Sequence, residues 1–344
     1  MNSLAPLIAL VGAIVWLAGA QAARAQAPAP RDDLKVTFCG TSGPLPIRDR
    51  AKTCVVIQAA GAMYLVDVGP ESAKNLQLWR MPVADTHAVF ITHLHSDHIG
   101  DLGEFNDNSW EAGRAAPLTV VGPPGVEKLT EGLNEAYSPD HGFRHAHHDH
   151  GDVRLTVESS QMVAKVVTLP TRPGPDGVRS AVVWTEGALK VTAIWVEHSP
   201  ATPAYGYRFD YKGRSVVISG DTKYWPPLAT AARGADVLIH EAQNAQFTAM
   251  VVDALKGMGN ARFSSMMNDT LSYHTTPVEA AQIAKAAGVK VLVFYHLTQA
   301  GLPMFTPEAF TRGVDAVFPN WKLSKDGMTI TLPVGTPDIQ FGQQ

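Results

Sequence analysis

Residues 88–98 read AVFITHLHSDH, an apolar and β-branched run that leads directly into three histidines and an aspartate. A run of this length and composition predicts a buried strand. His93 and His95 are two positions apart in the segment that follows, so an extended backbone points both side chains the same way and they can bind one cation. Asp97 and His98 lie beyond the expected bend and can bind a second.

Imidazole and carboxylate groups at this density suit Zn²⁺ or a neighbouring first-row metal ion. The chain has two cysteines, Cys39 and Cys54, and both precede the motif, so no thiolate ligand is available nearby. A single His-x-His pair would be equally compatible with structural histidines. Four ligand-type side chains within six residues, directly after a strand, instead predict a metal site.

Short β-branched runs that end in a ligand-type side chain recur along the chain. If the carboxyl ends of these strands share one edge of a sheet assembly, the polar clusters converge on one site. Strands that simply end at the surface would explain one or two such clusters, but not the repeated choice of His and Asp. The predicted strands are 63–66 before Asp67, 88–92 before His93, 191–196 before Glu197 and His198, 215–220 before Asp221, 237–239 before His240 and Glu241, and 291–295 before His296.

Helical patterns fall between these strands. The clearest predicts a helix over 277–287, because Thr276 is a suitable N-cap, a proline occupies the first helical position and Gly288 can end the helix. Residues 137–151 and 171–177 are polar or rich in turn-forming residues, and they predict loops. The other predicted helices span 72–79, 125–136, 226–232 and 307–314.

Five of the thirteen histidines fall within residues 141–150. The tract is compatible with a lid over the site, with an accessory metal-binding segment and with a solvated loop, and the sequence leaves these three interpretations open. His240 is predicted to be structural, because its neighbour Glu241 takes the functional place in the motif described below. His87 is predicted to lie at the surface.

The amino terminus is predicted to be a targeting segment. Residues 4–20 form a nearly unbroken apolar run, followed by a small-residue pattern at 23–25. This is typical of a secretory signal peptide, here residues 1–25, with a retained membrane anchor as the alternative. The mature domain would be 26–344, periplasmic or secreted, without stable membrane insertion. In an oxidising compartment Cys39 and Cys54 can pair, although two buried thiols are equally compatible with the sequence.

The composition excludes several classes of protein. The chain of 344 residues is 45% hydrophobic and 17% charged, which excludes a disordered chain and a multispan membrane protein. Its formal net charge is −4, and no cluster of Lys and Arg is visible. This disfavours nucleic acid as a partner and favours a small-molecule substrate. A homodimer is left open.

The motif of residues 93–98 resembles that of the metallo-β-lactamase superfamily, and the rest of the family's pattern follows in order along the chain. The resemblance implies an α/β fold, a four-layer αββα sandwich, over essentially the whole mature chain. It also implies a dinuclear site with Asp67 behind the ligands and Asp221 bridging the two ions. In this pattern His93, His95 and His198 hold one ion, and Asp97, His98 and His296 hold the other.

Two further segments, DVLIHEA at 236–242 and HTTP at 274–277, resemble the ribonuclease Z branch and its arylsulfatase-like relatives. β-Lactam hydrolysis is disfavoured, because the dinuclear zinc β-lactamases place a cysteine on the second ion where this chain has Asp221. Ribonuclease Z itself holds tRNA with a basic, Gly- and Pro-rich arm. Residues 137–151 instead contain two acidic residues and one basic residue besides histidines.

The sequence therefore predicts an exported dinuclear hydrolase that cleaves a phosphodiester or sulfate ester of a small substrate, such as an aryl ester. Zn²⁺ is the expected metal, with Mn²⁺ or Fe as alternatives. Two divalent ions lower the pKa of a shared water, and Asp97 would orient the resulting hydroxide. His274, whose pKa a Glu241 carboxylate would raise, is the candidate general acid, and a purely structural pair is the alternative.

Three other functions are kept as alternatives. They are a ribonuclease Z-like phosphodiesterase, a lactonase or carboxylic esterase, and a periplasmic metal-binding protein without turnover. A redox enzyme would require iron and would consume oxygen.

Overall fold

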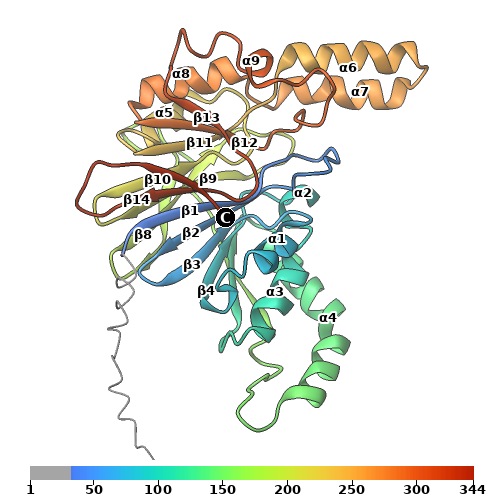
Figure 1. Cartoon of the computed structure of the whole chain (residues 1–344), viewed down its shortest axis with the longest axis vertical. Helices are drawn as coiled ribbons and strands as arrows, with labels where there is room; N and C mark the ends of the chain where they lie inside the picture. The colour runs from blue at the N-terminus through green and yellow to red at the C-terminus, as the bar shows by residue number, and fades with distance from the viewer. Residues whose placement is uncertain (1–31) are drawn as a thin grey trace, which may run out of the picture. The chain divides into compact units, whose positions relative to one another are not determined.

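Two β-sheets packed face to face form the centre of the fold (Figure 1). The computed structural model describes residues 32–344, so the predicted signal peptide at 1–25 lies outside the described residues. In hydrogen-bonding order the first sheet consists of β15 (Gln340–Gln343), β14 (Met328–Leu332), β1 (Leu34–Gly40), β2 (Cys54–Ala59), β3 (Ala62–Val66), β4 (Thr86–Phe90), β5 (Leu118–Gly122) and β6 (Met162–Val166).

The second sheet, like the first, contains both parallel and antiparallel strand pairs. In hydrogen-bonding order it consists of β13 (Trp321–Leu323), β12 (Val291–Tyr295), β11 (Val237–Glu241), β10 (Arg214–Ile218), β9 (Ala204–Tyr211), β8 (Leu189–Val196) and β7 (Ser180–Glu186). β10 to β13 are parallel, as are β3 to β6 of the first sheet, and the remaining pairs are antiparallel. Parallel strands end at the same edge, which is what the convergence of their polar ends requires.

Along the strands, side chains that point into the space between the sheets alternate with side chains that point away from it, and the former make up the core. In β8, Leu189, Val191 and Ala193 are buried in the inter-sheet cluster, whereas Lys190 between them is exposed. The first sheet contributes large side chains such as Tyr64 and Phe90 to the same cluster. Every second side chain of these strands therefore faces inward, and those of the two sheets together fill the space between them.

Helices cover the outer face of each sheet and complete the predicted four-layer αββα sandwich, which is confirmed. The bounds of the helices that accompany the first sheet are α1 (Ser72–Leu78), α2 (Ser96–Ile99), α3 (Leu102–Glu111) and α4 (Val126–His148), with a 3₁₀ turn at Val83–Asp85. Those that accompany the second are α5 (Pro226–Ala231), α6 (Ala245–Gly257), α7 (Ala261–Asp269), α8 (Pro277–Ala287) and α9 (Pro307–Phe310), with a 3₁₀ turn at Thr270–Ser272.

The helix predicted over 277–287 is confirmed at both ends. Thr276 accepts a hydrogen bond from the backbone of Glu279, whose side chain bonds back to the Thr276 N–H, so the two form a capping box. Gly288 ends the helix with a left-handed φ of 65°, a conformation that costs glycine little.

The loop predicted over 137–151 is wrong up to His148, because α4 continues through this segment. Pro139 leaves the carbonyl of Glu135 without its usual helical donor, and the Ser138 hydroxyl donates to that carbonyl at 2.8 Å instead. His141 is fully buried and lies 2.7 Å from the Asp107 carboxylate on α3. Contacts with α3 therefore stabilise a helix that the polar composition does not favour.

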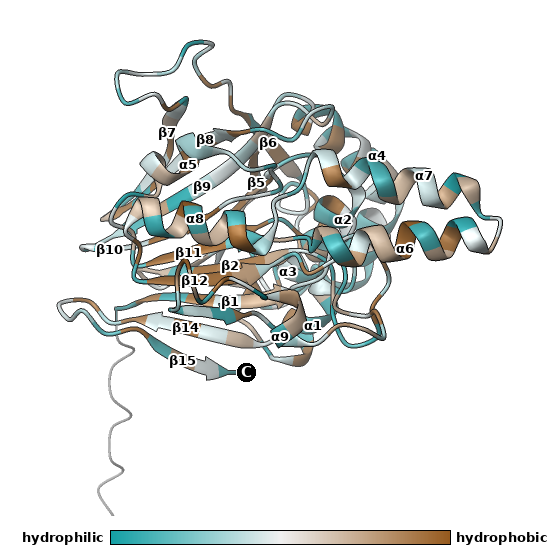
Figure 2. Ribbon diagram, turned by 90° about the horizontal axis from the view of Figure 1, so that it is seen from above, coloured by the Kyte–Doolittle hydropathy of each residue, from teal (hydrophilic) through white to brown (hydrophobic). Residues whose placement is uncertain are grey.

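The helices α6 and α7 were not predicted from the sequence. They form a hairpin that extends away from the sheets in Figures 1 and 2. Several of their large apolar side chains, among them Met250, Phe263 and Met266, are exposed and do not pack into a core. Each helix instead begins at an Asn N-cap, Asn244 for α6 and Asn260 for α7. The side chain of each Asn accepts a hydrogen bond from the backbone N–H three residues later.

Cys39 and Cys54 form a disulfide between β1 and β2. The sequence left this pairing open, and the structure places the two Cα atoms 5.0 Å apart. A crosslink that closes a loop of 15 residues stabilises a fold by roughly 3 kcal/mol. The closed loop, residues 40–53, includes Gly43, which contacts the ring of His296 so closely that a Cβ atom would lie 2.7 Å from it.

Candidate metal centre

The seven predicted metal ligands lie together at one edge of the two sheets, whereas Glu197 and His240, also predicted at strand ends, join none of the potential metal clusters of the described residues. β3 ends before Asp67 and β4 leads into the 93–98 motif, and both belong to the first sheet. The second sheet contributes His198 after β8, Asp221 after β10 and His296 after β12. All seven predicted metal ligands are within these segments, so residues from positions about 200 apart in the sequence share one site.

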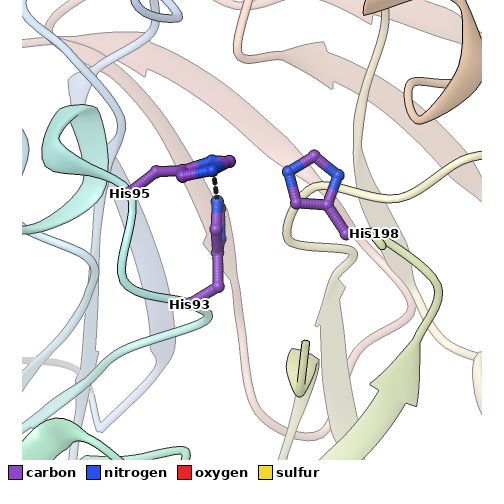
Figure 3. A group of neighbouring side chains, drawn as sticks. All are labelled: His93, His95 and His198. Carbon is purple, nitrogen blue, oxygen red and sulfur yellow. Dashed lines mark hydrogen bonds between the residues drawn. The ribbon is translucent and has the colours of Figure 1, made fainter. Parts of the chain in front are cut away.

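The first cluster consists of His93, His95 and His198. Their nearest ring nitrogens lie within 4.8 Å of one another, and Figure 3 shows the three rings around a common space. His93 Nε2 is 2.9 Å from His95 Nδ1. His93 and His198 are buried, whereas His95 is exposed.

The second cluster consists of Asp97, His98 and His296, all buried. Asp221 lies between the two clusters: its Oδ2 atom is 3.2 Å from His296 Nε2, 3.4 Å from His98 Nε2, 3.9 Å from His198 Nε2 and 4.0 Å from His93 Nε2. A single carboxylate can therefore face ligands of both clusters.

The donor atoms of this site fit bound metal ions. His98 Nε2, His198 Nε2 and Asp221 Oδ1 are buried and make no hydrogen bond with any of the described residues. Buried polar atoms without a partner are costly, and bound divalent cations at the two clusters would satisfy all three. The donors are imidazole nitrogens and carboxylate oxygens, the set that Zn²⁺ and its first-row neighbours accept.

Hydrogen bonds to the ring nitrogens that face away from the metal positions orient two of the proposed ligands, His98 and His198. His98 Nδ1 is 2.7 Å from Asp67 Oδ2, and the same carboxylate accepts hydrogen bonds from the Thr92 N–H and hydroxyl at 2.8 Å each. His198 Nδ1 donates to the backbone carbonyl of Tyr273 at 3.0 Å. Because Nδ1 of each ring is held, Nε2 is left to face the metal position.

Sequence reasoning missed two of these supporting residues. Thr92 is the last residue of the predicted strand, and its hydroxyl also lies 3.1 Å from His93 Nδ1 and 3.3 Å from His98 Nδ1. Tyr273 acts through its main chain, which no side-chain pattern reveals. A polar residue that ends an otherwise apolar strand was the only available signal for Thr92.

The electrostatics of the centre favour a cation. Burial lowers the pKa of His93 well below its usual value, aided by the nearby His98, so the ring is neutral and able to bind a metal. Burial also disfavours a charged His98, but Asp221, Asp67 and Asp97 outweigh it and raise the His98 pKa well above its usual value. Three carboxylates around one imidazole indicate a surplus of negative charge that bound cations would offset.

His274 and Glu241 form a pair beside the ligands. His274 Nδ1 is 2.9 Å from Glu241 Oε1, and the fully buried carboxylate also accepts hydrogen bonds from the backbone N–H groups of Thr222 at 3.1 Å and Thr275 at 3.3 Å. Burial lowers the pKa of His274, but Glu241 outweighs it and leaves the pKa raised. His274 stacks on His296, and one of its ring nitrogens lies within 4.8 Å of ligand-type atoms of Asp221 and His296.

His240 and His87 belong to none of the potential metal clusters within the described residues. His240 is buried, with Nδ1 2.7 Å from the backbone carbonyl of Glu241. His87 is on the surface, where Nδ1 lies 2.6 Å from Glu186. Of the His-rich tract, His141 belongs to the α3 contact, and no residue of 141–150 joins a potential metal cluster within 32–344.

Two cavities adjoin the centre, and His95 contributes to the lining of both. The first, of about 380 Å³, is lined by His93, His95 and a largely apolar rim: Leu94, Pro123, Pro124, Pro200, Ala201, Thr202 and Pro203. The second, of about 250 Å³, reaches the second cluster and is lined by Asp97, Asp221, His274, Tyr273, Met267 and Leu45 among others. Both have a ligand or a candidate catalytic residue in the wall.

Comparison with known proteins identifies relatives over most of the chain. The family described as "Beta-lactamase superfamily domain" matches residues 63–297. A ribonuclease Z of Mycobacterium marinum is 32% identical over 270 residues, which cover 78% of this chain and 87% of that protein. A ribonuclease Z of Mycolicibacterium gilvum is 31% identical over 266 residues, covering 76% and 84%.

Solved structures share the fold at lower identity. The metallo-β-lactamase fold protein YhfI from Bacillus subtilis superposes with a TM-score of 0.61 at 21% identity, covering 87% of this chain and all of that one. The short form of human tRNase Z gives the same TM-score, identity and coverage. Within the described residues, no helix is long and apolar enough to cross a membrane.

Proposed function

The chain belongs to the metallo-β-lactamase superfamily as a ribonuclease Z-like, metal-dependent hydrolase, and we propose that it is a dinuclear phosphodiesterase acting on a small organic diester. The arrangement around Asp221 carries the proposal. Its Oδ2 atom lies within 4.0 Å of a ring nitrogen from each of four histidines, two in each cluster. Two ions that share a carboxylate suit the cleavage of a phosphate ester, which develops charge on both the attacking and the leaving oxygen.

Each of the two clusters would hold one metal ion. His93, His95 and His198 would hold one ion, Asp97, His98 and His296 the other, and Asp221 would contact both. When bound, two such ions act as Lewis acids and lower the pKa of a coordinated water. The pKa of Asp97 is held at about 2: burial raises it, but His98 and His296 outweigh that effect. Asp97 is therefore ionised at neutral pH and can accept a hydrogen bond that orients the attacking water.

His274 is the proposed proton donor. Hydrolysis forms a bond between water oxygen and phosphorus and breaks the bond to the leaving oxygen, which then needs a proton. Glu241 holds His274 Nδ1, which leaves Nε2 for the cavity that His274 lines together with Asp97 and Asp221. The products are a phosphate monoester and an alcohol or phenol, and the proton of the attacking water passes to solvent.

The proposal is tested with metal-loaded protein and a panel of substrates. We expect about two divalent ions per chain and metal-dependent hydrolysis of bis(4-nitrophenyl) phosphate, with slower turnover of 4-nitrophenyl phosphate. The chelated protein should be inactive and should recover with Zn²⁺ or Mn²⁺. If 4-nitrophenyl sulfate, a carboxylic ester or a lactone is the preferred substrate, the phosphodiesterase assignment is wrong. If no member of the panel is hydrolysed, the chain is better described as a metal-binding protein.

Replacement of the proposed proton donor should matter most for poor leaving groups. We expect His274→Ala to lower kcat/KM for diphenyl phosphate about 10²-fold and for bis(4-nitrophenyl) phosphate less than about tenfold, because 4-nitrophenoxide leaves without a proton. Glu241→Gln should give the same pattern with a smaller effect. Steady-state kinetics with both esters provides the measurement, and metal content should stay at the wild-type value. An equal loss for both esters would assign His274 to metal binding or positioning.

A ribonuclease activity is the second candidate. The identity of 31–32% to two ribonucleases Z, over most of both chains, favours it. The candidate predicts cleavage of a tRNA precursor by the metal-loaded protein at a rate that exceeds its rate with a diaryl diester. The net charge of −4 argues against a long polyanion as the substrate.

We also propose that the protein is exported. The apolar run at 4–20 with its small-residue pattern at 23–25 supports this, as does the disulfide between Cys39 and Cys54, since disulfides persist in oxidising compartments. The mature protein should begin at Gln26. Mass spectrometry of the protein from a periplasmic or culture fraction checks this, and recovery of the full-length chain from the cytoplasm would contradict it.

A further inference from the structure

We infer that the two cavities beside His95 are separate subsites for the two substituents of a diester, one for the leaving group and one for the group that stays on phosphorus. The inference rests on the proposed function and adds to it an assignment of substrate class. A phosphate monoester has one organic substituent and would use one cavity. A centre that opens into two distinct cavities, both lined by His95, instead fits a phosphate that carries two.

The smaller cavity is the leaving-group subsite. Of the two cavities, it is the one lined by His274, the proposed proton donor, and a leaving oxygen must lie next to that donor. Leu45, Met267 and Tyr273 supply apolar and aromatic surface to its walls, while Thr270 supplies a hydroxyl. Met267 lies near the end of α7 and Thr270 begins the 3₁₀ turn that follows it. The end of the α6–α7 hairpin that is nearest the sheets would therefore form part of the leaving-group subsite.

The larger cavity is the subsite for the retained substituent. It contains neither His274 nor Glu241, and it meets the metal centre at His93 and His95. Its other walls come from two proline-containing segments, 123–124 and 200–203, together with Leu94. Thr202 contributes the one side-chain hydroxyl among these lining residues, so the surface suits an apolar group about the size of an aromatic ring.

The lining of both cavities disfavours a nucleic acid in these subsites. Neither contains a Lys or Arg among its described lining residues. A single-stranded polynucleotide would bring a further negative charge with each neighbouring nucleotide, and binding it requires cationic side chains along the path. The substrate class is therefore a phosphodiester with two neutral substituents, at least one of which is aromatic or similarly apolar.

Two substitutions, one in each cavity, test the assignment of the subsites. Ala201→Trp should fill the larger cavity, and Leu45→Trp should fill the smaller one. The substrates are bis(4-nitrophenyl) phosphate and methyl 4-nitrophenyl phosphate, which share a leaving group and differ in the retained group. We expect Ala201→Trp to lower the ratio of their kcat/KM values about tenfold, because only the bulky retained group is excluded. Leu45→Trp should lower both values together and leave the ratio within about twofold.

Ala249→Trp is the matched control, since Ala249 is exposed on α6 and lines neither cavity. It should change neither kcat/KM value, and circular dichroism and metal content should match wild type for all three variants. An Ala201→Trp variant that is folded and metal-loaded but leaves the ratio unchanged overturns the inference. So does a wild-type preference for a short RNA over both esters, although the phosphodiesterase assignment would then stand. Absence of any diester hydrolysis would remove the proposed function itself.

Discussion

Asp221→Ala is expected to reduce the bound metal from about two ions per chain to one or none and to lower kcat/KM for bis(4-nitrophenyl) phosphate about 10³-fold or more. Asp221 is the side chain whose Oδ2 atom lies close to ring nitrogens of both clusters. Its removal leaves those imidazoles around a gap without negative charge. Two-ion sites contribute several kcal/mol of transition-state stabilisation, and each 1.4 kcal/mol is about a factor of ten in rate.

Metal analysis by mass spectrometry and steady-state kinetics measure the two effects separately. Asp221→Asn provides a second variant, because it keeps the shape of the side chain while removing its charge, and it should also bind fewer ions. His240→Gln is the matched control: His240 is equally buried at the end of β11 but lies outside the ligand clusters. It should retain two ions and keep kcat/KM within about threefold. An Asp221→Ala variant with two ions and near-wild-type turnover would refute the bridging role.

The positions of the proposed ligands could be predicted because each one follows a strand. Short β-branched runs are a strong local signal, and parallel strands of one sheet end at a common edge, so Asp221 and His296 could be expected together. That His93, which follows a strand of the other sheet, joins them was implied by the resemblance to the superfamily. The four-layer sandwich followed from the resemblance of the 93–98 motif to a known superfamily. Neither inference required knowledge of packing between distant side chains.

Features that depend on tertiary contacts could not be predicted. The segment 137–151 suggests a loop because it is polar, yet α4 extends to His148, since His141 is buried against Asp107 on α3. The supporting role of Tyr273 depends on a main-chain carbonyl, which carries no residue-specific pattern. The pairing of Cys39 with Cys54 required the register of β1 and β2, which a sequence does not contain.

Asp67 is buried at the centre of a hydrogen-bond network that fixes the tautomer of His98. It has a left-handed backbone, with φ at 59°, which Asp and Asn tolerate better than most residues. Its Oδ1 accepts the Thr92 N–H, and its Oδ2 accepts the Thr92 hydroxyl and faces His98 Nδ1. With Nδ1 protonated, His98 presents the lone pair of Nε2 to the second metal position.

Asp67→Asn should therefore weaken binding of the second ion about 10- to 100-fold and lower the free energy of unfolding by roughly 1–3 kcal/mol. The amide has one acceptor where the carboxylate has two. If its NH₂ group faces His98, Nδ1 becomes the acceptor and the proton moves to Nε2, which can then no longer bind metal. If its NH₂ group faces the Thr92 N–H instead, two donors oppose each other in a buried site. Either orientation loses a hydrogen bond that the wild-type protein makes.

Asp107→Asn separates the two effects, because Asp107 also forms a buried pair with a histidine, His141 at 2.7 Å, but lies outside the metal centre. Both variants should unfold at lower denaturant concentration, since each breaks a buried charge-assisted contact. Only Asp67→Asn should lower affinity in a Zn²⁺ titration of the apo-protein, and its loss of activity should be recovered in part at high metal concentration. If Asp107→Asn weakens Zn²⁺ binding as much as Asp67→Asn does, the effect of Asp67 is one of general stability and not of the His98 tautomer.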